Sequence, residues 1–158
     1  MSDDDKISPE KAREQAAEFL GVFAGQDFDL DGKKWHLPNP NYLPPDMKRR
    51  YLEYLRFVNK DLDKEKVADP ITGKQREQTV WPLTYNNALI DEDELLCIAL
   101  MGTGDGKDDR AAYFKDGTLP ETYQQFLKAG GVPGQIQVAW RVMNIQMEER
   151  VKRDPKSR

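Results

Sequence analysis

Cysteine and histidine are almost absent from this chain of 158 residues, which contains one of each, Cys97 and His36. A zinc site needs several such ligands at close spacing, so no zinc site of ordinary composition can be built. A catalytic Ser-His-Asp or Cys-His arrangement would depend on His36 alone, and an internal disulfide is impossible. We therefore expect a protein that is not an enzyme, has no metal or cofactor, and resides in a reducing compartment.

Long apolar runs are also missing, since no stretch approaches the ~20 residues of a membrane span. The N-terminus is acidic, Met1 to Asp5, where a secretory signal would be basic and then apolar. These features predict a cytoplasmic protein with no membrane association. The net charge of -4 argues against broad binding to nucleic acid, and only the basic end from Arg150 to Arg158 could support such a role.

The modest hydrophobic content, 38% against 33% charged residues, predicts a small core with solvated ends. We expect a mainly α fold, a small helical domain with a short N-terminal β-hairpin and flexible termini. The expected divisions are an N-terminal acidic segment and helix (1–25), a hairpin plus helical body (26–151) and a basic C-terminal tail (152–158).

A β-hairpin is predicted around the pair Asp31-Gly32, because apolar and polar residues alternate on both sides of it. A two-residue turn places Phe28 opposite Trp35 and collects apolar side chains on one face. On the other face, Asp29 lies opposite Lys34 and Asp27 lies opposite His36, which brings opposite charges together.

Five helices are predicted from apolar spacing and end signals. Ser8-Pro9 begins the first, over about residues 9–23. The clearest amphipathic helix runs from Met47 to Leu62. Asp91 and Glu94 form a capping box before a helix over Leu95 to Met101. Pro120 and Pro133 begin the last two helices, and the final one carries the stripe Ile136, Trp140, Met143, Met147 and Val151.

Three segments between these elements are interpreted from their composition. The charged stretch from Lys64 to Thr79 is expected to be a loop or mobile insertion. The stretch from Trp81 to Tyr85 is apolar again and should anchor the chain on the core. The stretch from Gly102 to Asp109, rich in glycine and aspartate, is expected to be a mobile acidic linker.

Two motifs suggest ligand sites and fail on inspection. Asp27, Asp29 and Asp31 copy the first half of an EF-hand loop, but its closing glutamate position holds Pro38, so we expect no calcium binding. The run from Gly102 to Lys107 is similar to a phosphate-binding loop, but the required glycine and hydroxyl positions hold Met101 and Asp108.

The order of segments resembles the tail assembly chaperones of long-tailed phages of actinobacteria. The residues that carry this resemblance are the hairpin, the run Trp35-His36-Leu37-Pro38-Asn39-Pro40, the helical body, and the stretch Gly130-Gly131-Val132-Pro133-Gly134 to Glu149 before a charged tail. The resemblance implies a protein of the host cytoplasm, active in tail morphogenesis, that binds the tape-measure protein, keeps it soluble and helps to recruit tail-tube protein. It also implies a longer form made by ribosomal frameshifting, and Asp154-Pro155-Lys156 can encode a slip site, as can Thr72-Gly73-Lys74.

The side chains predicted to bind this partner combine apolar area with adaptable shape or positive charge. Core packing is the alternative role for the methionines and Trp140, and a homo-oligomer is left open. A structural virion component, such as a head-to-tail connector or minor tail protein, is the alternative function. The predicted partner-binding residues are Tyr51, Tyr54, Trp140, Met143, Met147, Arg150, Lys152 and Arg153.

Overall fold

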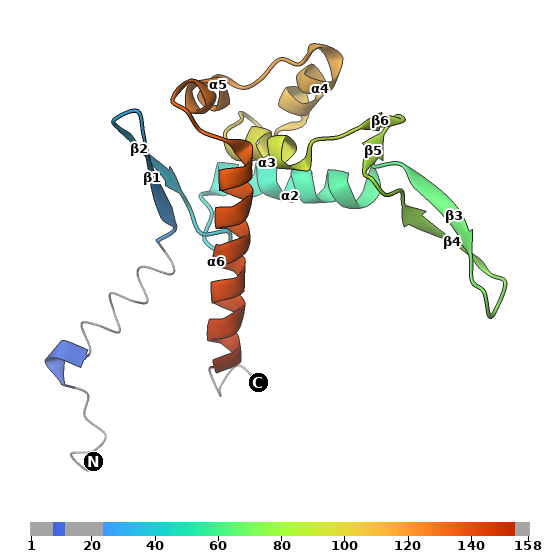
Figure 1. Ribbon diagram of the computed structural model, residues 1–158, viewed down its shortest axis with the longest axis horizontal. Coiled ribbons are helices and arrows are strands. Elements are labelled where there is room, and N and C mark those ends of the chain that lie inside the picture. The colour runs from blue at the N-terminus through green and yellow to red at the C-terminus, as the bar shows by residue number, and fades with distance from the viewer. Residues whose placement is uncertain (1–7, 12–23, 154–158) are drawn as a thin grey trace. The chain divides into compact units, whose positions relative to one another are not determined.

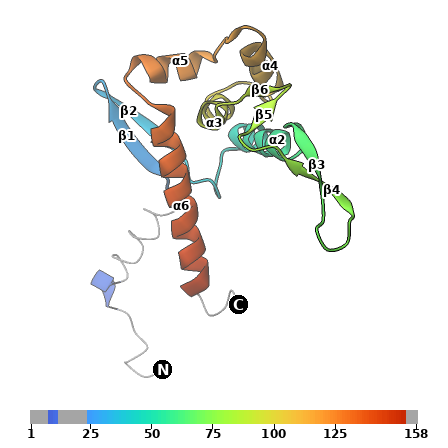
Figure 2. The same cartoon turned by 45° about the vertical axis from the view of Figure 1, so that its right-hand side comes forward.

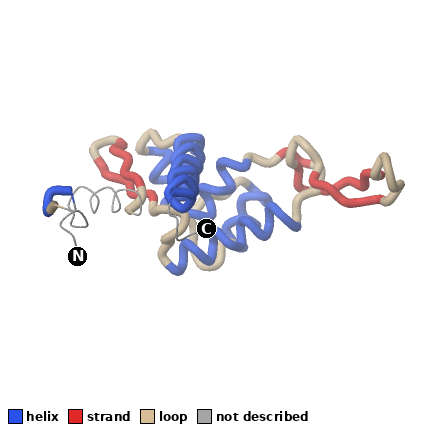
Figure 3. The backbone as a smooth tube through the Cα atoms, turned by 90° about the horizontal axis from the view of Figure 1, so that it is seen from below, coloured by secondary structure: helices blue, strands red, loops and turns tan. Residues whose placement is uncertain are grey.

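The computed structural model describes residues 8–11 and 24–153, with side chains up to residue 149. In this described part, the fold is mixed α/β and about half helical, with three antiparallel hairpins (Figures 1 and 3). The expected N-terminal hairpin is present, but it is one of three, so the fold is not mainly α. The elements are β1 Gln26–Leu30, β2 Lys33–Leu37, α2 Pro45–Lys60, β3 Lys64–Ala68, β4 Gln75–Thr79, β5 Thr84–Tyr85, β6 Ala88–Leu89, α3 Glu92–Leu100, α4 Lys107–Asp116, α5 Glu121–Lys128 and α6 Pro133–Arg153.

The β1–β2 hairpin has the predicted register. Phe28 pairs with Trp35, Asp29 with Lys34 and Asp27 with His36. Asp31 and Gly32 both have positive φ, 51° and 74°, as a two-residue turn that follows the strand twist requires. The apolar face is partly or fully buried, whereas the charged face is exposed.

The segment from Lys64 to Thr79 is not a loop but the β3–β4 hairpin, which corrects the prediction. Neither strand has an apolar face, and most of its side chains are exposed. Asp69 orders the turn by accepting hydrogen bonds from the backbone N–H groups of Ile71 (2.8 Å) and Thr72 (3.3 Å). The hairpin therefore depends on turn chemistry and polar cross-strand pairs, which an apolar pattern does not reveal.

The third hairpin, β5–β6, is held by one carboxylate. Asp63 accepts hydrogen bonds from the hydroxyl of Thr84 (2.7 Å) and from the backbone N–H of Asn87 (2.8 Å). The stretch from Trp81 to Tyr85 was expected to anchor the chain on the core, but Trp81 itself is 82% exposed and takes no part in this. Tyr85 makes the apolar contact instead, against Phe57.

The predicted helices are present as α2, α3, α5 and α6. Asp91 caps α3 by accepting from the backbone N–H of Glu94 (3.1 Å), as the capping box requires. At the other end of α3, Arg50 of α2 donates from Nε to the carbonyl of Ala99 (2.7 Å). The N-terminal helix is described only at Pro9 to Lys11, where the N–H of Lys11 donates to Ser8 Oγ (3.2 Å), and its remainder lies outside the described residues.

The predicted acidic linker is partly helical, which is a further correction. Only residues 102–106 form a loop, and α4 begins at Lys107 and ends before Gly117. Asp109 bridges back to the loop, where it accepts from the backbone N–H of Thr103 (2.6 Å). Asp109, one of the acidic residues that suggested a linker, therefore serves as a hydrogen-bond acceptor for the loop.

The chain divides into two compact units. Unit 1 comprises Met1–Pro44 and Ala129–Arg158, and unit 2 comprises Pro45–Lys128. In unit 2, α2 packs against α3 and α3 against α4, and six consecutive residues of α3, Leu95 to Leu100, are buried. None of the described helices is both long and apolar enough to cross a membrane.

Candidate functional site

Helix α6 of unit 1 carries apolar residues on two opposite faces. Ile136, Trp140 and Met143 are buried, at 4%, 4% and 3% exposure. Val138, Val142 and Ile145 recur at four- and three-residue spacing on the other side of the helix and are 62%, 43% and 47% exposed. We call these three residues the α6 row. A surface helix normally has one apolar face, which packs on the core. The α6 row is a second apolar face, and it is available for contact with another molecule.

The α6 row borders an open groove within unit 1, lined by residues of β1 and α6, two elements labelled in the ribbon of Figure 2. Val138 and Val142 of α6 and Phe28 of β1 are among its lining residues. The volume of this groove is about 430 Å³. Gly134 belongs to the lining, and a Cβ added there would meet no atom within 4 Å, so the groove is open at that end. Its shape and apolar lining suit the side chains of a partner helix.

A second site in unit 2 is built on three aromatic rings from different elements. The centroids of Tyr85 of β5 and Phe114 of α4 are 4.8 Å apart, and those of Phe57 of α2 and Tyr85 are 5.1 Å apart. The rings lie in an open pocket of about 400 Å³, which Lys107 and Lys115 of α4 also line. We call this the aromatic pocket.

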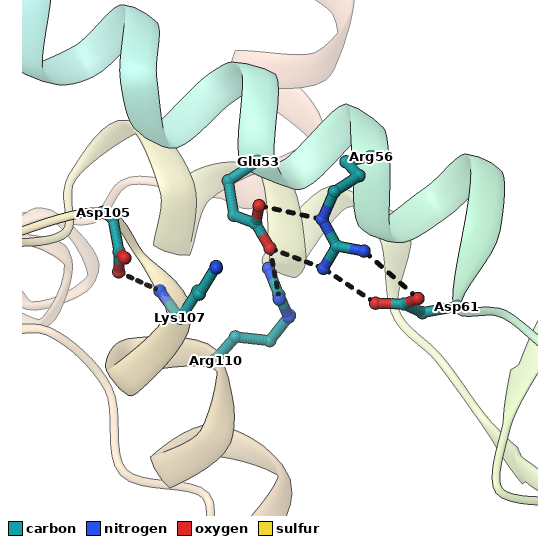
Figure 4. Close-up of polar contacts among 6 residues, drawn as sticks. All are labelled: Glu53, Arg56, Asp61, Asp105, Lys107 and Arg110. Carbon is teal, nitrogen blue, oxygen red and sulfur yellow. Dashed lines mark hydrogen bonds and ion pairs between the residues drawn. The ribbon is translucent and has the colours of Figure 1, made fainter.

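An ion network borders the aromatic pocket (Figure 4). Glu53 of α2 accepts from Arg56 (2.7 Å) and from Arg110 of α4 (2.9 Å), and Arg56 also contacts Asp61 (2.9 Å). Hydrogen bonds from Arg56, followed by those from Arg110, lower the pKa of the Glu53 carboxyl to about 2, against the opposing effect of partial burial. The guanidinium of Arg110 lies 4.4 Å from the ring centroid of Phe57. The network therefore joins α2 to α4 and fixes the pocket between them.

The predicted partner-binding residues lie in several environments. Tyr54, Trp140 and Met143 are buried, whereas Tyr51 and Met147 are partly exposed. The backbones of Arg150, Lys152 and Arg153 belong to α6, and their side chains lie outside the description. Tyr51 and Tyr54 belong to unit 2, and the other six residues belong to unit 1. Their role in partner binding stays a prediction, and the three buried side chains could contact a partner only after local opening.

The residues that suggested metal or nucleophile chemistry have structural partners. His36 Nδ1 lies 2.7 Å from Asp27 Oδ1 as a cross-strand pair. Among the described residues, no group of three or more histidine, cysteine or acidic side chains could hold a metal ion. Cys97 is fully buried, and burial raises the pKa of its thiol to about 12, so it is a poor nucleophile.

Sequence reasoning overlooked both surfaces that the structure exposes. The α6 row is visible in the sequence as a second helical stripe, but partner binding was predicted for the more apolar stripe that contains Trp140 and Met143. Phe57 lies three residues after Tyr54, in phase with the α2 stripe. Phe114 follows Lys107, Arg110 and Ala111 at helical spacing between two glycines, a pattern that would have predicted α4.

No family model, no curated protein and no solved structure matches this chain.

Proposed function

We propose that this protein is a tail assembly chaperone of a long-tailed phage, which binds the tape-measure protein and keeps it soluble during tail morphogenesis. The observation that supports this function is the α6 row. It leaves three branched apolar side chains on the outside of a helix of 21 residues, beside a groove with an aromatic wall at Phe28. A chaperone of a long helical partner needs such a surface, because it must cover apolar stripes without a deep, selective pocket.

The proposed contact is helix against helix. The α6 row offers anchors at i, i+4 and i+7, the spacing at which one helix presents a stripe to another. Its three residues are of moderate size, so each contact site along the partner would be weak. Binding at many similar sites would then give useful overall affinity. The basic positions Arg150, Lys152 and Arg153 continue α6 and would attract acidic stretches of the same partner.

The test is co-expression of the downstream tape-measure protein with this chain, followed by measurement of the soluble fraction. Val138→Asp combined with Val142→Asp places charge in the α6 row and should reduce the soluble partner to the amount seen without the chain. Asn144→Asp is the control for added charge, since it places one negative charge at an exposed position of α6 outside the row and should retain activity. Thermal melting of each variant checks that the fold is intact.

Two results would contradict the proposal. The first is a partner that is equally soluble without this chain. The second is stoichiometric retention of this chain in finished particles, because a chaperone leaves before the particle is complete. Retention would favour a structural virion component instead.

A further inference from the structure

We propose that the aromatic pocket of unit 2 binds an acidic peptide segment of a partner protein. One apolar side chain of the peptide enters the pocket, and the peptide carries a carboxylate on either side of it. This site uses none of the residues of the α6 row, so the inference goes beyond the proposed function. It rests on the ring cluster and on the basic side chains of α4 that line the pocket, two of them lysines at the rim.

The floor of the pocket is apolar and closely packed. Phe57 is 2% exposed and is held by Tyr85, Phe114 and the guanidinium of Arg110. Phe114 is 37% exposed, so its ring remains available to a ligand. A flat apolar or aromatic side chain can stack in such an opening, where it gains from burial and from ring contacts.

Two of the three acidic residues of α4 are bound to neighbouring loops. Asp109 accepts from the N–H of Thr103, and Asp116 accepts from the N–H of Thr118 (3.1 Å), so both carboxylates serve neighbouring loops. Lys107, Arg110 and Lys115 line the pocket instead. Figure 4 shows that Arg110 is occupied by Glu53 and that Asp61, the acidic group of the lining, is occupied by Arg56.

The rim therefore has excess positive charge. Within the described part of the chain, neither Lys107 nor Lys115 forms an ion pair. The whole chain has a net charge of -4, so a cationic rim around an apolar opening is a local feature and not a consequence of composition. Charge complementarity thus identifies an acidic occupant.

The spacing of the two lysines suggests the form of the peptide. They are eight residues apart on α4, which corresponds to about 12 Å along the helix axis. An extended peptide covers a similar distance in about four residues, with alternate side chains on one side. The matching pattern is acidic-x-apolar-x-acidic, in which both carboxylates and the central side chain face the pocket.

The binding test uses a peptide with glutamates flanking a phenylalanine in that pattern, titrated into the full chain by calorimetry and by NMR chemical shifts. We expect weak, salt-sensitive binding that perturbs Tyr85 and Phe114. The same peptide with lysines in place of the glutamates, or alanine in place of the phenylalanine, should bind at least about fivefold more weakly.

Protein variants locate the site. Lys107→Glu combined with Lys115→Glu should weaken binding of the glutamate peptide by about fivefold or more. The control is Lys48→Glu combined with Lys128→Glu, which makes the same charge change at exposed lysines outside the pocket lining and should alter affinity less than about twofold. Phe114→Ala should also weaken binding, and melting curves confirm that each variant is folded.

Several outcomes would overturn the inference. These are no detectable binding, equal binding of the lysine peptide, an equal effect of the two lysine pairs, or tighter binding of a single-stranded oligonucleotide in the same pocket. The α6 variants should leave peptide binding unchanged. Failure of this inference and failure of the chaperone proposal are therefore separate results.

Discussion

At the scale of single residues, Glu53 determines the electrostatics of unit 2. Its carboxylate is only 12% exposed and accepts hydrogen bonds from two arginines, one on its own helix and one on α4. An ion pair between exposed side chains is worth little, but a partly buried carboxylate shared by two guanidinium groups is costly to remove. Of the three groups, only Glu53 changes its charge with pH, because an arginine stays charged at every accessible pH.

Glu53 should make stability depend on pH in acid. Its pKa falls from 4.5 to about 2 on folding, so between these values the unfolded chain binds more protons. The contribution of Glu53 is therefore complete above about pH 4.5 and is lost as the pH falls toward about 2. Glu53→Gln should remove this part of the pH dependence and lower the free energy of unfolding at pH 7 by about 1–2 kcal/mol.

Urea denaturation at a series of pH values measures this effect. The control is Asp46→Asn, since Asp46 is also on α2 but is 79% exposed and lies 3.8 Å from its arginine. Its removal should change stability by less than about 0.5 kcal/mol. Parallel pH profiles for the wild type and Glu53→Gln would contradict the assignment.

At the scale of elements, the β1–β2 hairpin was predicted to the register and the β3–β4 hairpin was missed. In the first, large apolar residues alternate with charges around Asp31-Gly32, so only one register satisfies both faces. In the second, Lys64–Ala68 and Gln75–Thr79 have almost no apolar face. The turn at Asp69 is the main local feature of this segment, and a turn without an apolar pattern around it predicts a loop.

Gly25, just before β1, and Gly32, in the turn of the β1–β2 hairpin, should respond differently to substitution by alanine. Gly32 has φ of 74° with no atom within 4 Å of an added Cβ, so Gly32→Ala should cost only the backbone strain of about 1 kcal/mol. Gly25 has φ of 96°, and an added Cβ would overlap the carbonyl oxygen of Leu37. Gly25→Ala should therefore cost about 3 kcal/mol or more.

Equilibrium unfolding followed by tryptophan fluorescence measures both changes. Trp35 is a suitable probe, because its ring lies in β2 with the ammonium of Lys33 at 4.5 Å from the centroid. An equal decrease in the free energy of unfolding for the two substitutions would show that the close approach of Gly25 to Leu37 does not add to the cost of Gly25→Ala.

At the scale of the whole molecule, the chain forms one continuous and one discontinuous unit. Unit 2 is the uninterrupted segment Pro45–Lys128, whereas unit 1 joins the two ends of the chain. Unit 2 has its own buried groups, among them Phe57, Leu96 and Phe126. A continuous segment with its own buried core is a candidate for independent folding.

The fragment of residues 45–128 should therefore fold without the rest of the chain. We expect a helical circular dichroism spectrum and a cooperative thermal transition, with lower stability than the full chain because a smaller unit buries a smaller share of its surface. The remaining pieces, 1–44 and 129–158, mixed as separate peptides, should show no such transition. A fragment of 45–128 that melts without cooperativity would contradict this division.

Local chemistry in the sequence was sufficient for the β1–β2 register, the Asp91 cap and the start of α6 near Pro133, because each depends on residues a few positions apart. Tertiary structure alone decided which face of α6 is buried, since Trp140 and Val138 are both apolar and only packing separates 4% from 62% exposure. It also decided the aromatic pocket, where Phe57, Tyr85 and Phe114 meet across 57 positions of chain. Contacts at that separation arise from the packing of whole elements, and no short window of sequence contains them.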